Sequence, residues 1–449
     1  MDPGIPPTPP SPRPTLAGLS SGLDLRLRVT SAELLGLPWM ERLGEWDATS
    51  VAIQDVPVGP SRHLVRFVEA DGRLWALKEM PEAIARKEYE VLRELEDRDL
   101  SAVRAAGMVV QPFEDTAVLV THYLESSWQY RRLLMRVPIT MRAHRARLFD
   151  AIAALLVDLH RNGFYWGDCS LANTLFMRDG QLIRAWLVDA ETAEWHEALS
   201  SGQRNLDLDI MTENILGGLL DVAARLEAPD DAVDQMVDEA EGVRRRYDAL
   251  WALLHEEPVI GLDDRFQVQA RVHRLNELGF AVDEVRLETE QSGAERVRLR
   301  IAVAGRTFHA DQLRELTGLD VGEGQATILM NDLRSHISRL RRDYGYDVAD
   351  AVAAQSWLYD VFRPEVARAH EAVRWIGDPT QAYCDLLEVR WLLSEEAGTD
   401  VGDDPALEAL AHRIAPTESV ANLAFVDVAT RELPALGLDT PKDGSRPSS

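Results

Sequence analysis

The stretch YWGDCSLANTLF, residues 165–176, places a carboxylate at Asp168 and an amide at Asn173 between apolar flanks. This five-residue offset predicts a loop that carries the Asp at its tip and the Asn where a strand, predicted over 172–177, begins. One interpretation is a polar turn, in which Asp168 bonds to its own backbone. The other is part of a phosphoryl-transfer site. The rest of the chain has to decide between them.

The sequence upstream of this loop is rich in predicted strands. HLVRFVEA and RLWALKEM, joined by Asp-Gly, predict an antiparallel hairpin over 63–79. A helix is predicted over 82–96, and two short strands over 108–115 and 117–124. A further short amphipathic helix is predicted over 31–46 despite Pro38. The first 125 residues therefore predict a small sheet that carries one helix.

The sequence around and after the loop is mainly helical. A long helix is predicted to end at Gly163, a strand covers 183–191, and helices occupy about 205–256. Beyond about 262 the prediction is a helix at 264–278, a hairpin made of AVDEVRLETE and ERVRLRIAVAG, and four more helices. These four helices are placed at about 309–317, 324–343, 349–376 and 380–397. The change in character places a domain boundary near 257–262.

Five polar residues occur in the order and on the elements that nucleotide phosphoryl transfer requires. Lys78 lies on a strand and can hold phosphate oxygens, and Glu88 on the next helix can orient it. Asp189, at the end of LVDAE, and Asn173 offer oxygen ligands for a divalent metal. Asp168 can face an acceptor hydroxyl. Taken singly, each has a plainer interpretation, such as a solvated strand-end lysine, a surface helix residue or a strand cap.

This order of motifs resembles the protein-kinase-like fold, in its lipopolysaccharide-kinase and RIO-like branch, over about residues 50–225. The resemblance implies that Asp168 is the catalytic base and that Asn173 and Asp189 bind Mg²⁺. It further implies that Lys78 anchors the phosphates of ATP and that Glu88 is its partner. Residues from about 230 to 400 resemble DUF4032, the domain of unknown function that accompanies such a kinase-like half in bacterial proteins.

One further segment is assigned to the adenine of ATP by the same resemblance. VTHYLE, residues 120–125, is similar to the hinge that bonds adenine, which implies the backbone of His122, Tyr123 and Leu124.

The phosphate-covering loop is PVGPSRH, where N–H groups of Gly59, Ser61 and Arg62 can cradle phosphate but Pro60 has none. The loop has one glycine where kinases usually have two or three. The metal motif reads Asp-Ala-Glu rather than Asp-Phe-Gly, so Glu191 is either a second acidic ligand or a solvent-facing residue. No Ala-Pro-Glu segment follows, which favours a small-molecule, glycan, lipid or self acceptor over a regulated protein substrate.

Composition narrows the functional classes. The 449-residue chain has a formal net charge of −27, which argues against general binding to nucleic acids or anionic membranes. Its two cysteines are too few for a disulfide framework or a structural zinc site. No apolar run reaches the ~18 residues of a membrane span, and the N-terminus does not resemble a signal peptide. We therefore expect a soluble, cytoplasmic protein.

A basic island interrupts this acidic chain. No acidic residue occurs between Ser126 and Phe149. The basic residues of the island are Arg131, Arg132, Arg136, Arg142, His144, Arg145 and Arg147. They either receive an anionic acceptor, since arginine forks suit phosphate and carboxylate, or form a solvated face or pairs with the acidic C-terminal half.

These observations predict an α+β chain with a bilobal kinase-like domain at 22–257, in which the N-lobe covers about 48–125 and the C-lobe about 126–257. A disordered Pro-rich tail at 1–21 precedes it. A mostly helical DUF4032-like domain with a β-hairpin follows at 262–400, and then an extension at 401–449 whose end is disordered. The predicted function is an ATP- and Mg²⁺-dependent phosphotransferase with an unidentified acceptor. The alternative is a nucleotide-binding pseudokinase that signals through its C-terminal domain. The sequence leaves the oligomeric state open.

Overall fold

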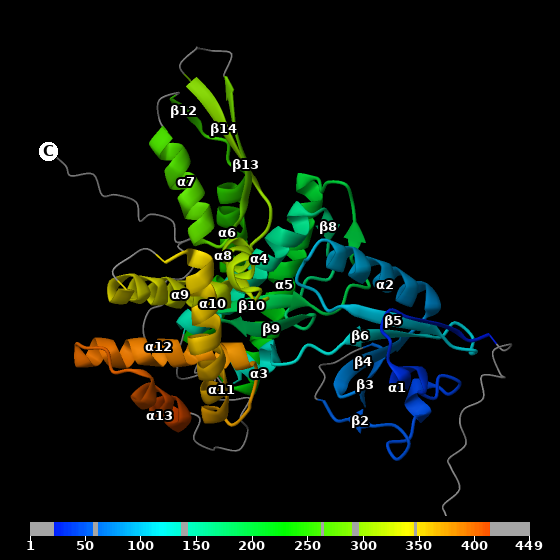
Figure 1. Cartoon of the computed structure of the whole chain (residues 1–449). Helices are drawn as coiled ribbons and strands as arrows, with labels where there is room; N and C mark the ends of the chain where they lie inside the picture. Colours follow the sequence, from blue (N-terminus) through cyan, green and yellow to red (C-terminus); the bar gives the residue numbers. More distant parts are fainter. Residues whose placement is uncertain are drawn as a thin grey trace, which may run out of the picture. The chain divides into compact units, whose positions relative to one another are not determined.

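The structure is a computed structural model (Figure 1) that describes residues 22–56, 62–135, 142–261, 265–289, 296–344 and 348–413. The chain divides into two compact units. Unit 1 runs up to Leu124 and takes in Leu187–Trp195, and unit 2 comprises Glu125–Trp186 and the chain from His196 onward. The predicted tail at 1–21 and the predicted disordered end of the extension lie outside the described residues.

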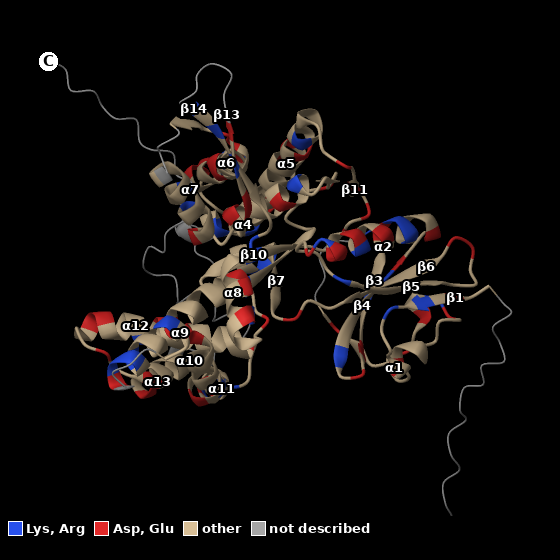
Figure 2. Ribbon diagram, turned by 45° about the horizontal axis from the view of Figure 1, so that its top comes forward, with Lys and Arg blue, Asp and Glu red and all other residues tan. Residues whose placement is uncertain are grey.

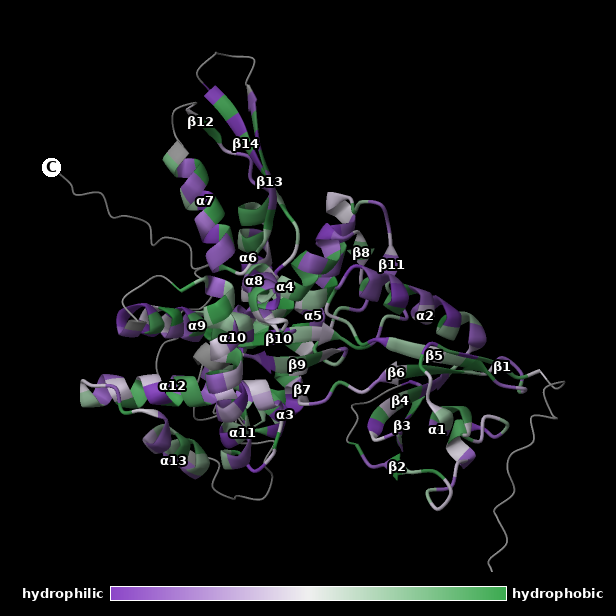
Figure 3. Ribbon diagram, in the orientation of Figure 1, coloured by the Kyte–Doolittle hydropathy of each residue, from purple (hydrophilic) through white to green (hydrophobic). Residues whose placement is uncertain are grey.

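Unit 1 is built on a six-stranded antiparallel sheet in the order β1-β5-β6-β4-β3-β2. The strands are β1 Asp24–Leu27, β2 Ile53–Gln54, β3 Leu64–Ala70, β4 Arg73–Met80, β5 Ala105–Val110 and β6 Ala117–His122. Helix α2, Glu82–Asp97, runs along one face of the sheet, and mixed acidic and basic residues line its hydrophilic outer side (Figures 1, 2 and 3). The other face of the sheet packs on the segment that contains the buried residues Leu34, Trp39 and Trp46.

The hairpin predicted over 63–79 is confirmed. Asp71 and Gly72 both have positive φ, 50° and 68°, which is the geometry of a two-residue turn that matches the twist of the flanking strands. The predicted helix over 82–96 is also confirmed as α2. Its buried apolar residues, Ala85, Val91, Leu92 and Leu95, follow helical spacing.

Two other predictions in unit 1 need correction. The helix predicted over 31–46 is wrong: the structure has only α1, Ala32–Leu35, and a 3₁₀ turn at Leu43–Glu45. Gly36 ends α1, and Pro38 disfavours helical backbone in the residue before it and offers no N–H. The strand predicted at 108–115 lies earlier, at Ala105–Val110, and pairs with β1, a strand the sequence did not predict.

The first part of unit 2 combines a small sheet with long helices. Its strands, in the order β10-β9-β7, are β7 Ser127–Gln129, β9 Thr174–Asp179 and β10 Leu182–Leu187, whose last residue is assigned to unit 1. The helices are α3 Tyr130–Leu134, α4 Arg142–Arg161, α5 Ser201–Arg225 and α6 Asp230–His255. The short strand β8, Phe164–Tyr165, lies between α4 and β9 in the sequence. Another short strand, β11 Glu194–Trp195, follows β10 in the segment that is assigned to unit 1. The predicted end of the long helix is confirmed, because Gly163 follows α4 with φ of 80°.

The rest of unit 2 contains the second predicted hairpin and the C-terminal helices. Its three-stranded sheet has the order β12-β14-β13. The elements are β12 Val259–Gly261, α7 Arg265–Glu277, β13 Val282–Thr289, β14 Arg296–Val303, α8 Phe308–Thr317, α9 Glu323–Tyr344, α10 Asp350–Ser356, α11 Arg363–Ala372, α12 Pro379–Ala397 and α13 Asp403–Arg413. The single helix predicted over 349–376 is interrupted, because a π-helical segment at Trp357–Phe362 separates α10 from α11. The α+β class is confirmed, whereas the boundary near 257–262 stays a prediction.

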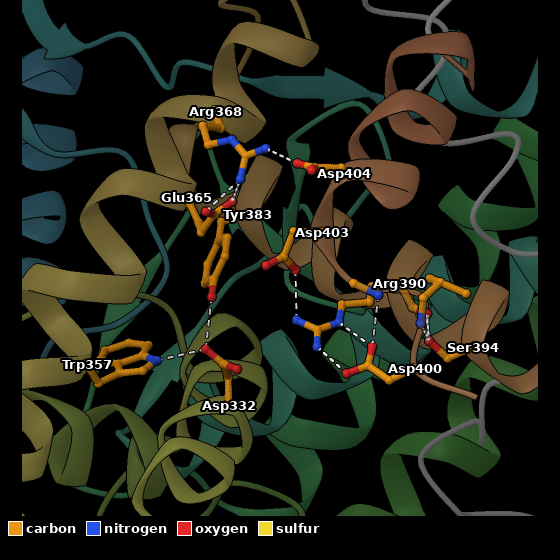
Figure 4. Close-up of polar contacts among 12 residues, drawn as sticks. Asp332, Trp357, Glu365, Arg368, Tyr383, Arg390, Ser394, Asp400, Asp403 and Asp404 are labelled. Atoms are coloured by element: carbon orange, nitrogen blue, oxygen red, sulfur yellow. Dashed lines mark hydrogen bonds and ion pairs between the residues drawn. The ribbon is translucent and has the colours of Figure 1, made fainter. Parts of the chain in front are cut away.

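The C-terminal helices are joined by buried polar contacts as well as by an apolar core. Asp332 on α9 accepts hydrogen bonds from Trp357 Nε1 at 2.7 Å and from the Tyr383 hydroxyl at 2.9 Å (Figure 4). Both aromatic side chains are fully buried. One carboxylate therefore ties α9 to the π-helical segment and to α12. Among the described helices, none is both long and apolar enough to cross a membrane.

Candidate active site

Lys78 reaches its position through the alternation of β4. Trp75 and Leu77 point into the buried cluster on one face of the sheet, so Lys78 points to the opposite face, which α2 covers. Its Nζ lies 3.1 Å from Glu88 Oε2 and 2.9 Å from Asp189 Oδ2, and its side chain is 13% exposed. The interpretation of Lys78 as a solvated strand-end lysine is therefore wrong.

Glu88 belongs to the buried stripe of α2, three residues after Ala85 and four before Leu92. Its side chain is 1% exposed, and its Oε1 accepts a hydrogen bond from the backbone N–H of Ala190 at 3.3 Å. Burial raises the pKa of Glu88 to about 7, although Lys78 opposes this rise. Burial would also lower the pKa of Lys78, but the charges of Glu88 and Asp189 outweigh it and the pKa lies above its ordinary value.

The residues after β10 add a second carboxylate to this cluster. Glu191 Oε2 lies 3.0 Å from His63 Nε2 and 3.7 Å from Lys78 Nζ, and its side chain is 14% exposed. The backbone N–H of Glu191 donates to Asp189 Oδ1 at 3.2 Å. Of the two interpretations left open by the sequence, the solvent-facing one is therefore wrong. Asp189 was predicted at a strand end and lies two residues beyond β10.

The carboxylates of this cluster fit a hard divalent cation. Oxygen atoms of Glu88, Asp189 and Glu191 lie within 4.8 Å of one another, and carboxylate oxygens are the ligands that Mg²⁺ prefers. Glu88 is the least accessible of the three, because its side chain is only 1% exposed. Asp189, with a side chain 28% exposed, and Glu191 are therefore better placed as ligands.

Asp168 and Asn173 are brought together in unit 2 by their loop. Asn173 Nδ2 donates to Asp168 Oδ2 at 3.0 Å and to the Asp168 carbonyl at 3.1 Å. Ser170 supports this turn, because its hydroxyl accepts from the Asn173 N–H at 3.2 Å and its carbonyl accepts from Thr174 Oγ1 at 2.8 Å. The spacing quoted at the outset thus closes a loop around the Asp168 carboxylate.

Two residues of α5 that the sequence analysis missed hold this loop through hydrogen bonds. Asp207, fully buried, accepts from the N–H groups of Trp166 at 2.7 Å and Gly167 at 2.8 Å. Asn214, seven residues later on the same helix face, donates to Asp168 Oδ1 at 3.3 Å and to the Cys169 carbonyl at 3.1 Å. The signal was available, because Asp207 and Asn214 share the helical spacing of the buried Met211.

His160 completes the support of the loop. Its Nε2 lies 3.1 Å from Asp207 Oδ2 and its Nδ1 lies 2.8 Å from the Tyr247 hydroxyl. Burial lowers the pKa of His160, and Asp207 only partly offsets this effect. The imidazole is therefore neutral near pH 7, and it links α4 to α5 and α6.

The segments assigned to adenine and phosphate have mixed outcomes. The N–H of His122 donates to the Arg104 carbonyl, and the N–H of Tyr123 donates to the Leu74 carbonyl, at 2.9 and 3.1 Å. Any adenine contact from His122–Leu124 would therefore use other groups of this segment. In the phosphate-covering loop, Gly59 and Ser61 lie outside the described residues. Arg62 is described and is exposed.

Part of the basic island pairs within the chain. Arg131 forms an ion pair with Asp221 at 2.7 Å, and the buried Arg145 makes a two-bonded contact with Glu239, at 2.7 and 2.9 Å. These two arginines follow the intramolecular interpretation. The side chains of Arg136, Arg142 and His144 lie outside the described residues, so the structure leaves an anionic acceptor at this island untested.

Comparison with known proteins finds two family matches along the chain. Residues 71–230 match the lipopolysaccharide kinase (Kdo/WaaP) family, and residues 249–414 match the domain of unknown function DUF4032. Among solved structures, WaaP in complex with acyl carrier protein matches with 20% identity and a TM-score of 0.30, covering 43% of this chain and 90% of that chain. No curated protein matches the chain. Both resemblances predicted from the sequence are confirmed.

Proposed function

We propose that this chain, which carries a lipopolysaccharide kinase (Kdo/WaaP) family segment followed by a DUF4032 segment, transfers the γ-phosphoryl group of ATP to a hydroxyl group. The observation that carries the proposal is the burial of Lys78 between Glu88 and Asp189. A lysine and two carboxylates drawn from three separate segments gain little as a purely structural device, because desolvating the charges offsets most of their attraction. A triphosphate bound with a divalent cation needs both kinds of group, because the lysine contacts phosphate oxygens and the carboxylates hold the cation.

The proposed reaction follows from the groups of this chain. The acceptor hydroxyl oxygen forms a bond to the γ-phosphorus, the bond from that phosphorus to the β–γ bridging oxygen breaks, and ADP leaves. Asp168 accepts the hydroxyl proton, and Lys78 holds phosphate oxygens. Mg²⁺, held by Asp189 with Asn173 or Glu191, would neutralise charge on the phosphates. The amide groups of Asn173 and Asn214 donate hydrogen bonds to Asp168 and hold its carboxylate in the loop.

The acceptor is a hydroxyl-bearing small molecule, glycan, lipid or the protein itself. The competing function is a pseudokinase that binds ATP and signals through the DUF4032 segment. The single-glycine phosphate loop and the Asp-Ala-Glu motif favour it, whereas the retained Asp168 disfavours it, since a nucleotide sensor needs no base.

Turnover of labelled ATP tests the proposal without knowledge of the acceptor. The protein is incubated with Mg²⁺ and ATP labelled on its γ-phosphate, and label is followed into phosphate, into the protein and into a panel of hydroxyl acceptors. We expect transfer that Asp168→Asn lowers by about 10²–10⁴-fold, the usual contribution of a general base. Asp209→Asn, an exposed position on α5, is the matched control and should keep full turnover.

The outcomes separate the two functions. Transfer that is lost only in Asp168→Asn supports the phosphotransferase. ATP binding in the wild type with no transfer to water, protein or any acceptor supports the pseudokinase instead. Equal transfer in the wild type and Asp168→Asn would remove Asp168 from the mechanism.

A further inference from the structure

The DUF4032 segment is bonded to the turn that ends the strand after Asn173. Arg178, the next-to-last residue of β9, makes two parallel hydrogen bonds to Asp385 on α12, with Nη2–Oδ1 of 2.6 Å and Nη1–Oδ2 of 2.8 Å. Both side chains are nearly buried, at 9% and 12% exposure. The charges of Asp385 outweigh the effect of burial and raise the pKa of Arg178. A buried pair of this kind has its geometry fixed far more tightly than a surface pair.

The turn at Asp179–Gly180 also makes hydrogen bonds to α9 and α12. Asp179 Oδ1 accepts the N–H of Gln325 at 2.9 Å, in the first turn of α9. Gly180 N–H donates to Gln381 Oε1 at 2.8 Å, and Gln381 Nε2 donates back to the Gly180 carbonyl at 3.1 Å. The turn therefore makes hydrogen bonds in both directions to one residue of α12.

Glycines allow this close approach. A Cβ at Gly322 would overlap the carboxylate of Asp179, and a Cβ at Gly324 would overlap its carbonyl. Gly180 has φ of 62°, and a Cβ there would lie 2.5 Å from the Gly324 carbonyl oxygen. No larger residue fits at these positions unless the two segments separate. The fit is therefore specific to these two pieces of chain.

The DUF4032 side of the contact is itself braced. Gln381 Nε2 donates to Asp385 Oδ1 at 2.9 Å, and Gln325 Nε2 donates to Asp378 Oδ2 at 2.6 Å. Asp332 further joins α9 to α12 through Tyr383 (Figure 4). Helices α9 and α12 thus meet the turn as one braced pair.

The other end of the same strand carries the site loop. Thr174, the first residue of β9, is fully buried and directly follows Asn173. Strand β9 is the central strand between β7 and β10. A short, central strand has little freedom to bend, so fixing it at Arg178–Gly180 limits how far Asn173 can shift at its start.

We infer that the DUF4032 segment is a positioning element for the kinase-like half, with Arg178, Asp179, Gln381 and Asp385 as positioning residues that set Asn173 through β9. The metal-binding part of this inference rests on the proposed function. DUF4032 is then not a separate module on a linker.

A pair of double variants tests the inference without leaving an unpaired buried charge. Arg178→Met/Asp385→Leu removes the ion pair between β9 and α12, which we call the clamp, but fills the space of both side chains. Buried ion pairs often tolerate such an exchange. Arg145→Met/Glu239→Leu is the matched control, because it removes an equally buried two-bonded pair that joins α4 to α6. Gly324→Ala is a third variant that disturbs the contact through shape alone.

The first readout is hydrogen exchange, which needs no activity. We expect the amides of 174–179 to exchange at least about tenfold faster in the Arg178/Asp385 double variant and in Gly324→Ala, because local opening sets the exchange rate. The control pair should leave them within about twofold of the wild type. Unchanged exchange in all variants, or an equal increase in the control pair, would overturn the inference.

The second readout is the Mg²⁺ concentration needed for ATP binding, measured by calorimetry on the full chain. A ligand set slightly out of place should need about 10–100-fold more Mg²⁺, whereas metal-free ATP binding should stay unchanged. Equal loss with and without Mg²⁺ would indicate general damage and contradict a positioning role. Failure of the wild type to bind ATP at all would refute the proposed function and the metal part of the inference. Hydrogen exchange would still show whether the Arg178–Asp385 pair fixes β9.

Discussion

The Lys78 cluster of unit 1 and the Asp168 loop of unit 2 are stabilised in opposite ways. In the first, charged side chains from β4, α2 and the segment after β10 bind one another directly. In the second, one carboxylate is held by neutral amides, from Asn173 and Asn214, and its loop backbone by Asp207. The difference matches the chemistry proposed for each, since phosphates need compensating charge and a base needs a fixed, unpaired carboxylate.

The largest effect should come from removing Asp207, because the loop depends on it. Asp207→Ala leaves the N–H groups of Trp166 and Gly167 buried without an acceptor, which should lower the free energy of unfolding by about 3 kcal/mol. Urea denaturation measures this change. Asp209→Ala, an exposed position two residues along α5, should stay within about 0.5 kcal/mol of the wild type. Equal effects at both positions would contradict the special role of Asp207.

Removing Lys78 should break the charged cluster. We expect a smaller change in the free energy of unfolding than for Asp207→Ala, but a large loss of affinity for ATP. Lys78→Met is expected to weaken MgATP binding by about two orders of magnitude, because a charge-assisted contact to phosphate is lost. Calorimetric titration gives the affinity. The chain offers a matched control in Lys87→Met, since Lys87 lies on α2 but is 44% exposed. Similar losses in the two variants would mean that general positive charge, rather than Lys78, binds the nucleotide.

Asn214 tests the amide side of the comparison. Asn214→Ala removes the donor to Asp168 Oδ1 and to the Cys169 carbonyl, which should leave the Asp168 carboxylate less well fixed toward an acceptor hydroxyl. Turnover at pH 7 should fall by about tenfold with ATP affinity unchanged. Asn205→Ala, on an exposed part of the same helix, is the control. A lower ATP affinity with unchanged turnover would make Asn214 a structural residue only.

The smallest effect concerns His160, which burial keeps neutral. Because its pKa in the fold lies below the ordinary 6.5, the unfolded chain binds the extra proton first. The contribution of His160 is therefore complete above pH 6.5 and is lost as the pH falls below it, by about 1 kcal/mol per pH unit. His160→Gln should remove this part of the slope below pH 6.5 in thermal or urea unfolding. Parallel wild-type and variant slopes would contradict a buried, neutral His160.

Patterns within a few residues of sequence predicted much of the fold and the residues proposed for the reaction, but not the residues that hold them in place. The Asp71–Gly72 turn, the stripe of α2 and the offset between Asp168 and Asn173 are all encoded within a few residues. Asp207 and Asn214 were missed because they act on a loop about 40 residues away, and helix spacing says that a residue faces inward without saying what it meets. The contact between Arg178 and Asp385 spans 207 residues, and no local signal marks it. Strand β1 was missed for the same reason.

Calorimetric titration of ATP into the full chain, with and without Mg²⁺, tests the central claim most directly. The account predicts one ATP per chain, bound more tightly with Mg²⁺ because Asp189 and its neighbours hold the ion that ATP brings. Binding that Mg²⁺ leaves unchanged would remove the metal from the account. The absence of binding in both buffers would contradict the claim that the Lys78 cluster is a nucleotide site.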